Sequence, residues 1–195
     1  MEKYKGKDGE KFIDVFQLED FTRWLERNHG KEKKIGLILH KKHTGKPSVS
    51  HKELMREAIC FGWIDTTIRK MDEDRFIRFF QKRSKNSKWS YNTLRYGKEL
   101  VKEKRMRPAG LAFYREGLKK LPHDHGIPNN PRTPKDLKEE LKKDKEAEKN
   151  FRGIAKSARK TYLRWLFRAK LPETRKKRIS TIVNRMSQRD RKNPF

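Results

Sequence analysis

Four groups of side chains in this sequence are of types that could perform chemistry. Cys60 is the single cysteine, Asp65 follows Trp63 in a basic neighbourhood, and histidines pair within His40–His43 and His123–His125. A cysteine could act as a nucleophile and an aspartate could donate or accept a proton. Paired histidines could serve as ligands of a transition metal.

A structural role is the simpler expectation for each group. Cys60 stands at the end of an apolar helix face, so we expect it to be buried as a small apolar residue. Neither histidine pair has the third ligand or the spacing of a dedicated metal site, so we expect no metal and no other cofactor. We expect Asp65 to pair with Arg69 or Arg95, with a catalytic role as the alternative. Because the sequence also lacks a glycine-rich phosphate loop, a nucleophile elbow and a His-Glu-x-x-His helix, we predict a protein that is not an enzyme.

Basic residues dominate the composition. Lys+Arg number 53 against 26 Asp+Glu in 195 residues, a formal net charge of +27, whereas a small soluble domain needs only about 2 to 8 charges. Residues 75–106 hold eleven Lys and Arg against two Glu, and residues 151–192 hold fifteen against two acidic residues. We therefore expect an anionic polymer as partner, above all nucleic acid, bound through its phosphates with little sequence preference. The alternative is a solvated lysine-rich surface of the kind found in proteins from hot habitats.

The two basic segments differ in pattern. In the first, Trp89 and Tyr91 are interleaved with the cations and could stack on bases or anchor the core. In the second, basic residues recur every fourth position from Arg152 to Arg168 and would form one ridge along a helix. The run 175–178 continues this ridge in the first turn of the last helix, where the helix dipole disfavours cations unless an anion binds. The predicted nucleic-acid-binding residues are Lys82, Arg83, Lys85, Lys88, Arg95, Arg152, Lys156, Lys160, Arg164, Arg168, Arg175, Lys176, Lys177 and Arg178.

The elements that must position these residues indicate an α+β protein. Apolar spacing predicts a helix within 18–30, and the apolar run 34–42 predicts a strand. A capping-box pattern begins a second helix over 50–62. Segments 63–70 and 75–82 are rich in β-branched and aromatic residues and flank an acidic turn, which indicates a hairpin. We expect these strands to form a small antiparallel sheet.

From residue 92 onward the periodicity is helical, so a mostly helical C-terminal region follows. The charged segment 135–149 predicts one solvated helix, and apolar residues from Phe151 to Ala169 form one stripe over five turns. The predicted organisation is a disordered N-terminus (1–10), an α+β unit (11–92), a helical pair (93–122), a linker rich in Pro and Asn (123–134), a helical region (135–188) and a basic tail (189–195).

No stretch approaches the roughly 18 apolar residues of a membrane span, and the first residues lead into no signal peptide. We therefore expect a cytoplasmic protein. The sequence indicates no particular oligomeric state.

Several multi-residue motifs occur in a characteristic order. They are Phe21-x-x-Trp24-Leu25, Gly62-Trp63-Ile64-Asp65, Ser87-x-Trp89-Ser90-x-Asn92, Pro108-Ala109-Gly110 and Trp165 followed by Glu173-Thr174-Arg175. Over residues 12–186 the chain resembles the YdeI/OmpD-associated family, also called OmdA-like or bacteriocin-protection proteins. It departs from the family pattern at Thr66-Thr67, where the family has Gly-Gln, and at Lys82-Arg83, where it has Pro-Arg.

The resemblance implies an N-terminal half similar to the YjbR/CyaY fold. It also implies an alternative function, protection against cationic antimicrobial peptides or bacteriocins through a protein partner or an anionic membrane surface. A chain with a net charge of +27 would repel cationic peptides. Nucleic-acid binding therefore remains the leading expectation.

Overall fold

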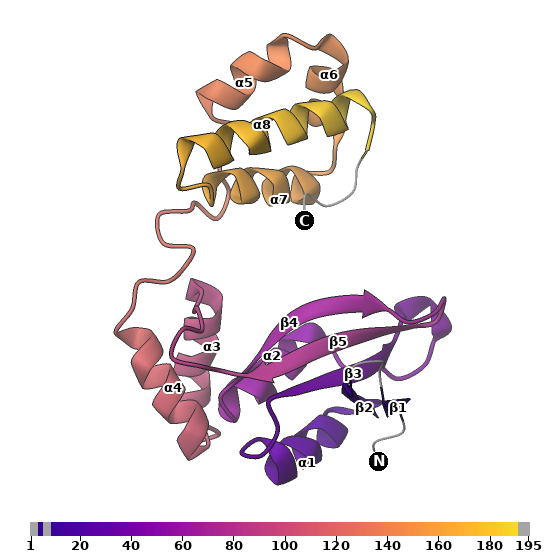
Figure 1. Cartoon of the computed structure of the whole chain (residues 1–195), viewed down its shortest axis with the longest axis vertical. Helices are drawn as coiled ribbons and strands as arrows, with labels where there is room; N and C mark the ends of the chain where they lie inside the picture. The colour runs from indigo at the N-terminus through magenta and orange to yellow at the C-terminus, as the bar shows by residue number, and fades with distance from the viewer. Residues whose placement is uncertain (1–3, 6–8, 191–195) are drawn as a thin grey trace. The chain divides into compact units, whose positions relative to one another are not determined.

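The computed structural model describes residues 4–5 and 9–190 of the chain (Figure 1). The chain divides into two compact units, residues 1–123 and 124–195. Every described strand lies in the first unit together with α1 to α4, and α5 to α8 build the second. The predicted α+β class is confirmed.

A five-stranded sheet organises the first unit. Its strands are β1 (Tyr4–Lys5), β2 (Lys11–Asp14), β3 (Lys34–His40), β4 (Trp63–Lys70) and β5 (Arg75–Lys82). Their order is β1-β2-β3-β5-β4; β2 and β3 run parallel, and the other neighbouring strands run antiparallel. The predicted strands β3, β4 and β5 form antiparallel pairs as expected, and β2, which the sequence did not predict, adds a parallel pair, so the sheet as a whole is mixed. Helix α1 (Leu18–Asn28) connects β2 to β3 as a crossover, which makes these two strands parallel.

The N-terminal segment differs from its prediction where it is described. Tyr4 and Lys5, expected to be disordered, form β1 against β2. Residues 1–3 and 6–8, and most of the basic tail (191–195), lie outside the described residues.

The main core lies between one face of the sheet and helices α1 and α2 (His51–Cys60). Phe21 and Leu25 of α1, Leu54 of α2, and Leu37 and Phe80 of the sheet are all fully buried there. The predicted capping box begins α2: the Ser50 hydroxyl accepts from the backbone N–H of Glu53. The short 3₁₀ helix η1 (Lys42–Thr44) lies between β3 and α2.

The opposite face of the sheet carries a second, smaller core. It consists of Phe12, Ile38, Ile77 and Phe79, all buried. Gly36 of β3 leaves space for Phe12, since a Cβ atom at Gly36 would lie 2.4 Å from that ring. Lys34 and Arg69, which both pair with Glu10, lie over the Phe79 ring on this face.

Helices α3 (Tyr91–Lys102) and α4 (Pro108–Leu118) complete the first unit. Ser90 caps α3 through its hydroxyl, which accepts from the backbone N–H of Thr93. Helix α4 approaches the end of α2 so closely that a Cβ at Gly110 would lie 2.1 Å from the Cys60 carbonyl oxygen. Only glycine fits at this position without a shift of the backbone.

The second unit consists of α5 (Lys135–Lys142), α6 (Lys145–Gly153), α7 (Lys156–Phe167) and α8 (Pro172–Ser187) around a separate core that includes Phe151, Leu166 and Ile182. Two predictions are wrong here. The single helix over 135–149 is two helices, because the Asp144 carboxylate caps α6 by accepting from the Ala147 N–H at 2.9 Å.

The apolar stripe from Phe151 to Ala169 is also divided between two helices. Ile154 and Ala155 are not helical, with ψ angles of 152° and 142°. Ile154 is nevertheless buried. The side chains of the stripe therefore stay inside the core although the helix is interrupted.

Candidate nucleic-acid interface

Arg83 and Trp89, in the first basic segment, are buried instead of facing solvent. Their exposed fractions are 2% and 5%. The Arg83 guanidinium lies 3.6 Å from the centroid of the Trp89 ring, and its Nη1 donates to the Lys88 carbonyl at 3.2 Å. Trp89 also packs edge-on against Tyr114. Trp89 is therefore a core anchor, and Arg83 does not lie on the exposed surface where the prediction placed it.

The remaining predicted cations of this segment are more exposed. Arg95 donates to the Glu99 carboxylate at 3.1 Å and to the Asn92 side chain at 2.8 Å, so its charge is partly compensated. Lys82 Nζ lies 3.5 Å from the Gly30 carbonyl. Lys85 and Lys88 are exposed, and none of the described residues forms an ion pair with either. Tyr91 is 51% exposed.

The ridge predicted from Arg152 to Arg168 is interrupted at its first step. Arg152 lies in α6 and pairs with Glu148 at 2.7 Å, whereas the next member, Lys156, begins α7. The fourfold spacing therefore does not place these two cations on one continuous helix.

Arg164 of α7 holds the loop that precedes α5. Its guanidinium donates to the Pro128 carbonyl at 2.8 Å and to the carboxylate of the buried Asp124 at 3.3 Å. The Arg164 side chain is only 18% exposed. Its charge is thus engaged within the second unit.

The run 175–178 at the start of α8 contains two kinds of basic residue. Arg175 makes a two-pronged bond to Asp136, with Nε and Nη2 at 2.6 and 3.0 Å from the carboxylate oxygens. The hydrogen bond from Arg175 holds the pKa of Asp136 below its usual value. Arg178 donates to the Trp165 carbonyl and lies 4.9 Å from the centroid of the Trp165 ring. Lys176 and Lys177 are exposed.

In the second basic segment, Arg164, Arg175 and Arg178 are therefore engaged within the protein, whereas the lysines stay exposed. The planar guanidinium fits carboxylates, carbonyls and aromatic faces, whereas the compact ammonium group is strongly hydrated and stays in water. Within 156–178 the sequence has ten Lys and Arg and one acidic residue, Glu173. The exposed cations of this segment for which no described residue is an ion-pair partner are Lys156, Lys160, Arg168, Lys170, Lys176 and Lys177.

Lys170 is the member of this set that the sequence did not predict. It lies in the turn between α7 and α8, outside the fourfold repeat that carried the prediction. Exposed turn residues next to a basic helix end would have been the signal to follow. We call the six cations the α7–α8 basic surface.

Asp65 pairs with different residues from those predicted. Its carboxylate lies 2.9 Å from His51 Nε2 and 3.4 Å from Arg78 Nη1. Arg69 pairs with Glu10 instead, and Arg95 with Glu99. Burial raises the pKa of Asp65, but the hydrogen bond from His51 and the charges of His51 and Arg78 outweigh burial and lower it. Asp65 is therefore ionised at neutral pH and suited to accept hydrogen bonds.

Cys60 is buried as predicted, with 2% exposure. Burial, reinforced by the nearby Glu57 carboxylate, raises the pKa of the thiol to about 12. Glu57 is itself buried and pairs with Arg105 at 2.7 Å. A thiol protonated to this degree is a poor nucleophile.

The histidines of residues 123–125 do not gather metal ligands. His123 Nδ1 lies 3.1 Å from the Trp89 carbonyl. The described part of the chain contains no group of three His, Cys, Asp or Glu side chains that could hold a metal ion.

The residues of the family motifs mainly support packing. Trp24 and Trp63 are buried and meet edge to face at 5.3 Å. Gly62 has a φ of +77°, a conformation that favours glycine at the turn from α2 into β4. Asn92 accepts a hydrogen bond from Arg95, and Glu173 and Thr174 lie in the first turn of α8.

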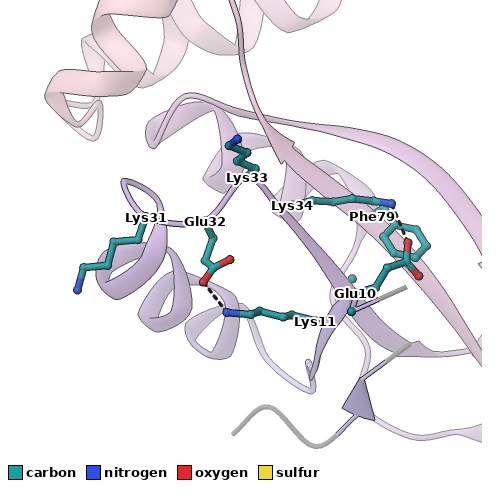
Figure 2. A pocket seen from close by; sticks show the side chains of 9 residues that line it. Glu10, Lys11, Lys31, Glu32, Lys33, Lys34 and Phe79 are labelled. Atoms are coloured by element: carbon teal, nitrogen blue, oxygen red, sulfur yellow. Dashed lines mark hydrogen bonds and ion pairs between the residues drawn. The ribbon is translucent and has the colours of Figure 1, made fainter. Parts of the chain in front are cut away.

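A second basic region lies around a pocket of about 390 Å³ at the start of β3 (Figure 2). Lys11 pairs with Glu32 at 2.6 Å, and Glu10 bridges Lys34 and Arg69 at 2.8 and 2.9 Å. Arg69 and Lys34 in turn lie over Phe79 and help to cover the smaller core. Figure 2 shows Lys31 and Lys33 pointing in different directions, so the lysines around this pocket do not converge on one anion.

Two family models match different parts of the chain. Residues 13–113 match a domain of unknown function, DUF8412, and this match covers more than half of the sequence. The chain belongs to the DUF8412 family. The DUF8412 match contains β3 to β5 and helices α1 to α3. The expected likeness of the N-terminal half to the YjbR/CyaY fold is not confirmed, since DUF8412 is the model that matches there.

Residues 130–189 match the model described as "Bacteriocin-protection, YdeI or OmpD-Associated". The resemblance to this family is thus confirmed for the segment that contains α5 to α8 and the α7–α8 basic surface. No curated protein and no solved structure matches the chain.

Proposed function

We propose that this DUF8412 protein is a non-enzymatic, cytoplasmic polyanion-binding protein, and that its partner is nucleic acid. The observation that carries the proposal is the α7–α8 basic surface, six exposed cations that no described residue neutralises. Lysine ammonium groups on flexible stems neutralise phosphates without reading bases. Binding would therefore be salt-dependent and nearly independent of sequence.

The arginines support this proposal indirectly. Arg164, Arg175 and Arg178 are engaged with Asp124, Asp136 and Trp165, and they hold the loop and the helices that present the lysines. The formal charge of the sequence thus overstates the charge available to a ligand. Only the exposed cations should contribute to binding.

A salt titration of affinity for a DNA duplex tests the proposal. If all six cations contact phosphates, the logarithm of the association constant K should fall linearly with the logarithm of the salt concentration. The slope should be about −5, because each neutralised phosphate contributes about −0.9. Two duplexes of unrelated sequence should give the same slope and similar affinities. No binding at low salt would refute the proposal, and so would a strong preference for one sequence.

A second candidate is bacteriocin protection through contact with an anionic membrane surface, since residues 130–189 match a model described as "Bacteriocin-protection, YdeI or OmpD-Associated". Leu171, at the turn between α7 and α8, is 67% exposed and lies next to Lys170 in sequence. Such a residue could enter a lipid headgroup region. No described helix has the length and apolarity to cross a bilayer. Binding to anionic vesicles in the absence of nucleic-acid binding would favour this candidate.

A further inference from the structure

Arg83 leaves one edge of its guanidinium without a partner. Nη1 donates to the Lys88 carbonyl at 3.2 Å. Nε and Nη2 are buried, and neither has an acceptor in the described part of the chain. These two groups form the edge that binds two oxygens of one anion, the same edge by which Arg175 holds Asp136.

A buried edge of this kind is an unusual feature. Most buried donors in native proteins are paired, because a donor that leaves water without a new acceptor loses its hydrogen bonds. Arg83 as a whole is only 2% exposed, so water does not reach it from the surface in this conformation. The burial lowers the pKa of Arg83 to about 9, which shows how little the surroundings compensate its charge.

The charges around Arg83 are also unbalanced. Among the described residues, Asp65 is the carboxylate whose charge acts on Arg83. Asp65 is already bonded to His51 and Arg78. The Arg78 side chain is 14% exposed, and its Nε has no acceptor in the described residues either. Two guanidinium groups therefore share one carboxylate, and a further negative charge would balance them.

The geometry holds Arg83 ready for such a charge. The guanidinium carbon lies 3.6 Å from the centroid of the Trp89 ring, and Nη1 donates to the Lys88 carbonyl, so these two contacts orient the group before a ligand arrives. In the loop 84–88 that follows Arg83, the side chains of Lys85 and Lys88 are exposed to solvent and are not part of the site. Ser84, Ser87 and Trp89 border a pocket of about 290 Å³ on the side of α4, which gives the loop open space beside it.

We propose that Arg83, held against Trp89, is the binding site of a small oxyanion, a phosphate or carboxylate group, which enters when residues 84–87 of the loop shift and Lys88 keeps its bond to Nη1. This site lies in the DUF8412 part of the chain and is independent of the α7–α8 basic surface. Two oxygens of the anion would accept from Nε and Nη2. The negative charge would complete the cluster of Arg78, Asp65 and Arg83.

Isothermal titration calorimetry with inorganic phosphate, and separately with acetate, tests the site at constant ionic strength. The full chain and the variants Arg83→Met and Lys85→Gln/Lys88→Gln are compared. We expect the wild type and the double lysine variant to bind one oxyanion with the same affinity, and Arg83→Met to bind it at least tenfold more weakly. The preferred probe identifies the ligand as a phosphate or a carboxylate.

Two results would overturn the proposal. One is equal phosphate affinity of Arg83→Met and the wild type, which would mean adventitious binding to surface lysines. The other is no binding of either probe to the wild type. Because Arg83→Met removes a buried group and could unfold the first unit, a second measurement uses the wild type alone: the NMR signal of the Arg83 Nε–H group should shift and saturate during the titration. An unchanged signal counts against the site.

Discussion

Replacing Arg175 should destabilise the second unit and replacing its neighbour Lys176 should not, although each change removes one positive charge from the same turn of α8. Arg175 donates twice to Asp136 of α5, while Lys176 is exposed and has no ion-pair partner among the described residues. Arg175→Gln should therefore lower the free energy of unfolding of the second unit. Lys176→Gln should leave it within about 0.5 kcal/mol of the wild-type value.

The expected loss for Arg175→Gln is about 1 to 1.5 kcal/mol. The Arg175 and Asp136 side chains are 29% and 42% exposed, so solvent screens their attraction. Exposed ion pairs contribute roughly 0.2–1 kcal/mol to stability, and the two-pronged geometry places this pair near the upper end of that range. The guanidinium also lies 5.8 Å from the Phe167 ring, a contact worth about 0.5 kcal/mol at an exposed site.

Urea unfolding followed by circular dichroism, with Asp136→Asn and the double variant added, measures the coupling between the two side chains. We expect a coupling free energy of about 1 kcal/mol at pH 7. Since Arg175 lowers the pKa of Asp136 in the folded state, this stabilisation is present above the unfolded pKa, about 4, and is lost as the pH falls through the lower folded value. Equal stability of Arg175→Gln and Lys176→Gln, or zero coupling at pH 7, would refute the reasoning.

Three further predictions concern the first unit. Gly110→Ala should lower the free energy of unfolding, measured by thermal denaturation, by about 3 kcal/mol, because the new Cβ would lie 2.1 Å from the Cys60 carbonyl oxygen. A loss of less than about 1 kcal/mol would show that α4 can move away from α2. Asp65→Asn should lower the free energy of unfolding by about 1 to 2 kcal/mol at pH 7, because Arg78 and His51 lose a charged acceptor. The difference from the wild type should shrink as acid protonates Asp65 in the wild type. A difference that stays constant between pH 7 and about 2 would contradict the ionised pair. The Cys60 thiol, with its pKa raised to about 12, should react with a disulfide reagent at pH 8 only after denaturation; rapid labelling of the native protein would contradict this burial.

The sequence predicted the elements whose signals are local. The capping box at Ser50 and Glu53, the hairpin of β4 and β5, and the buried position of Cys60 depend on residues close together in the chain. The parallel pairing of β2 with β3 was missed, because it depends on the path of α1 between them and not on either strand alone.

The basic residues could be predicted as a class but not sorted by role. Arg164 meets Asp124 across 40 positions, and Arg175 meets Asp136 across 39. Such pairs have no local periodicity. The interruption at Ile154 was equally hidden, because a buried isoleucine fits an apolar stripe whether its backbone is helical or extended. The tertiary fold therefore decides which cations remain available to a ligand.

Two double variants that remove the same charge from the second unit show whether the α7–α8 basic surface binds nucleic acid. Lys176→Gln/Lys177→Gln alters the α7–α8 basic surface, and Lys138→Gln/Lys142→Gln alters exposed positions of α5, where acidic residues balance the basic ones. The salt dependence of duplex binding is measured for both and for the wild type. We expect the first variant to make the slope of log K against log salt less steep by about 1.8, which corresponds to two phosphate contacts, and the α5 variant to keep the wild-type slope. Equal changes in both variants would mean that total charge, and not the surface presented by α7 and α8, determines binding.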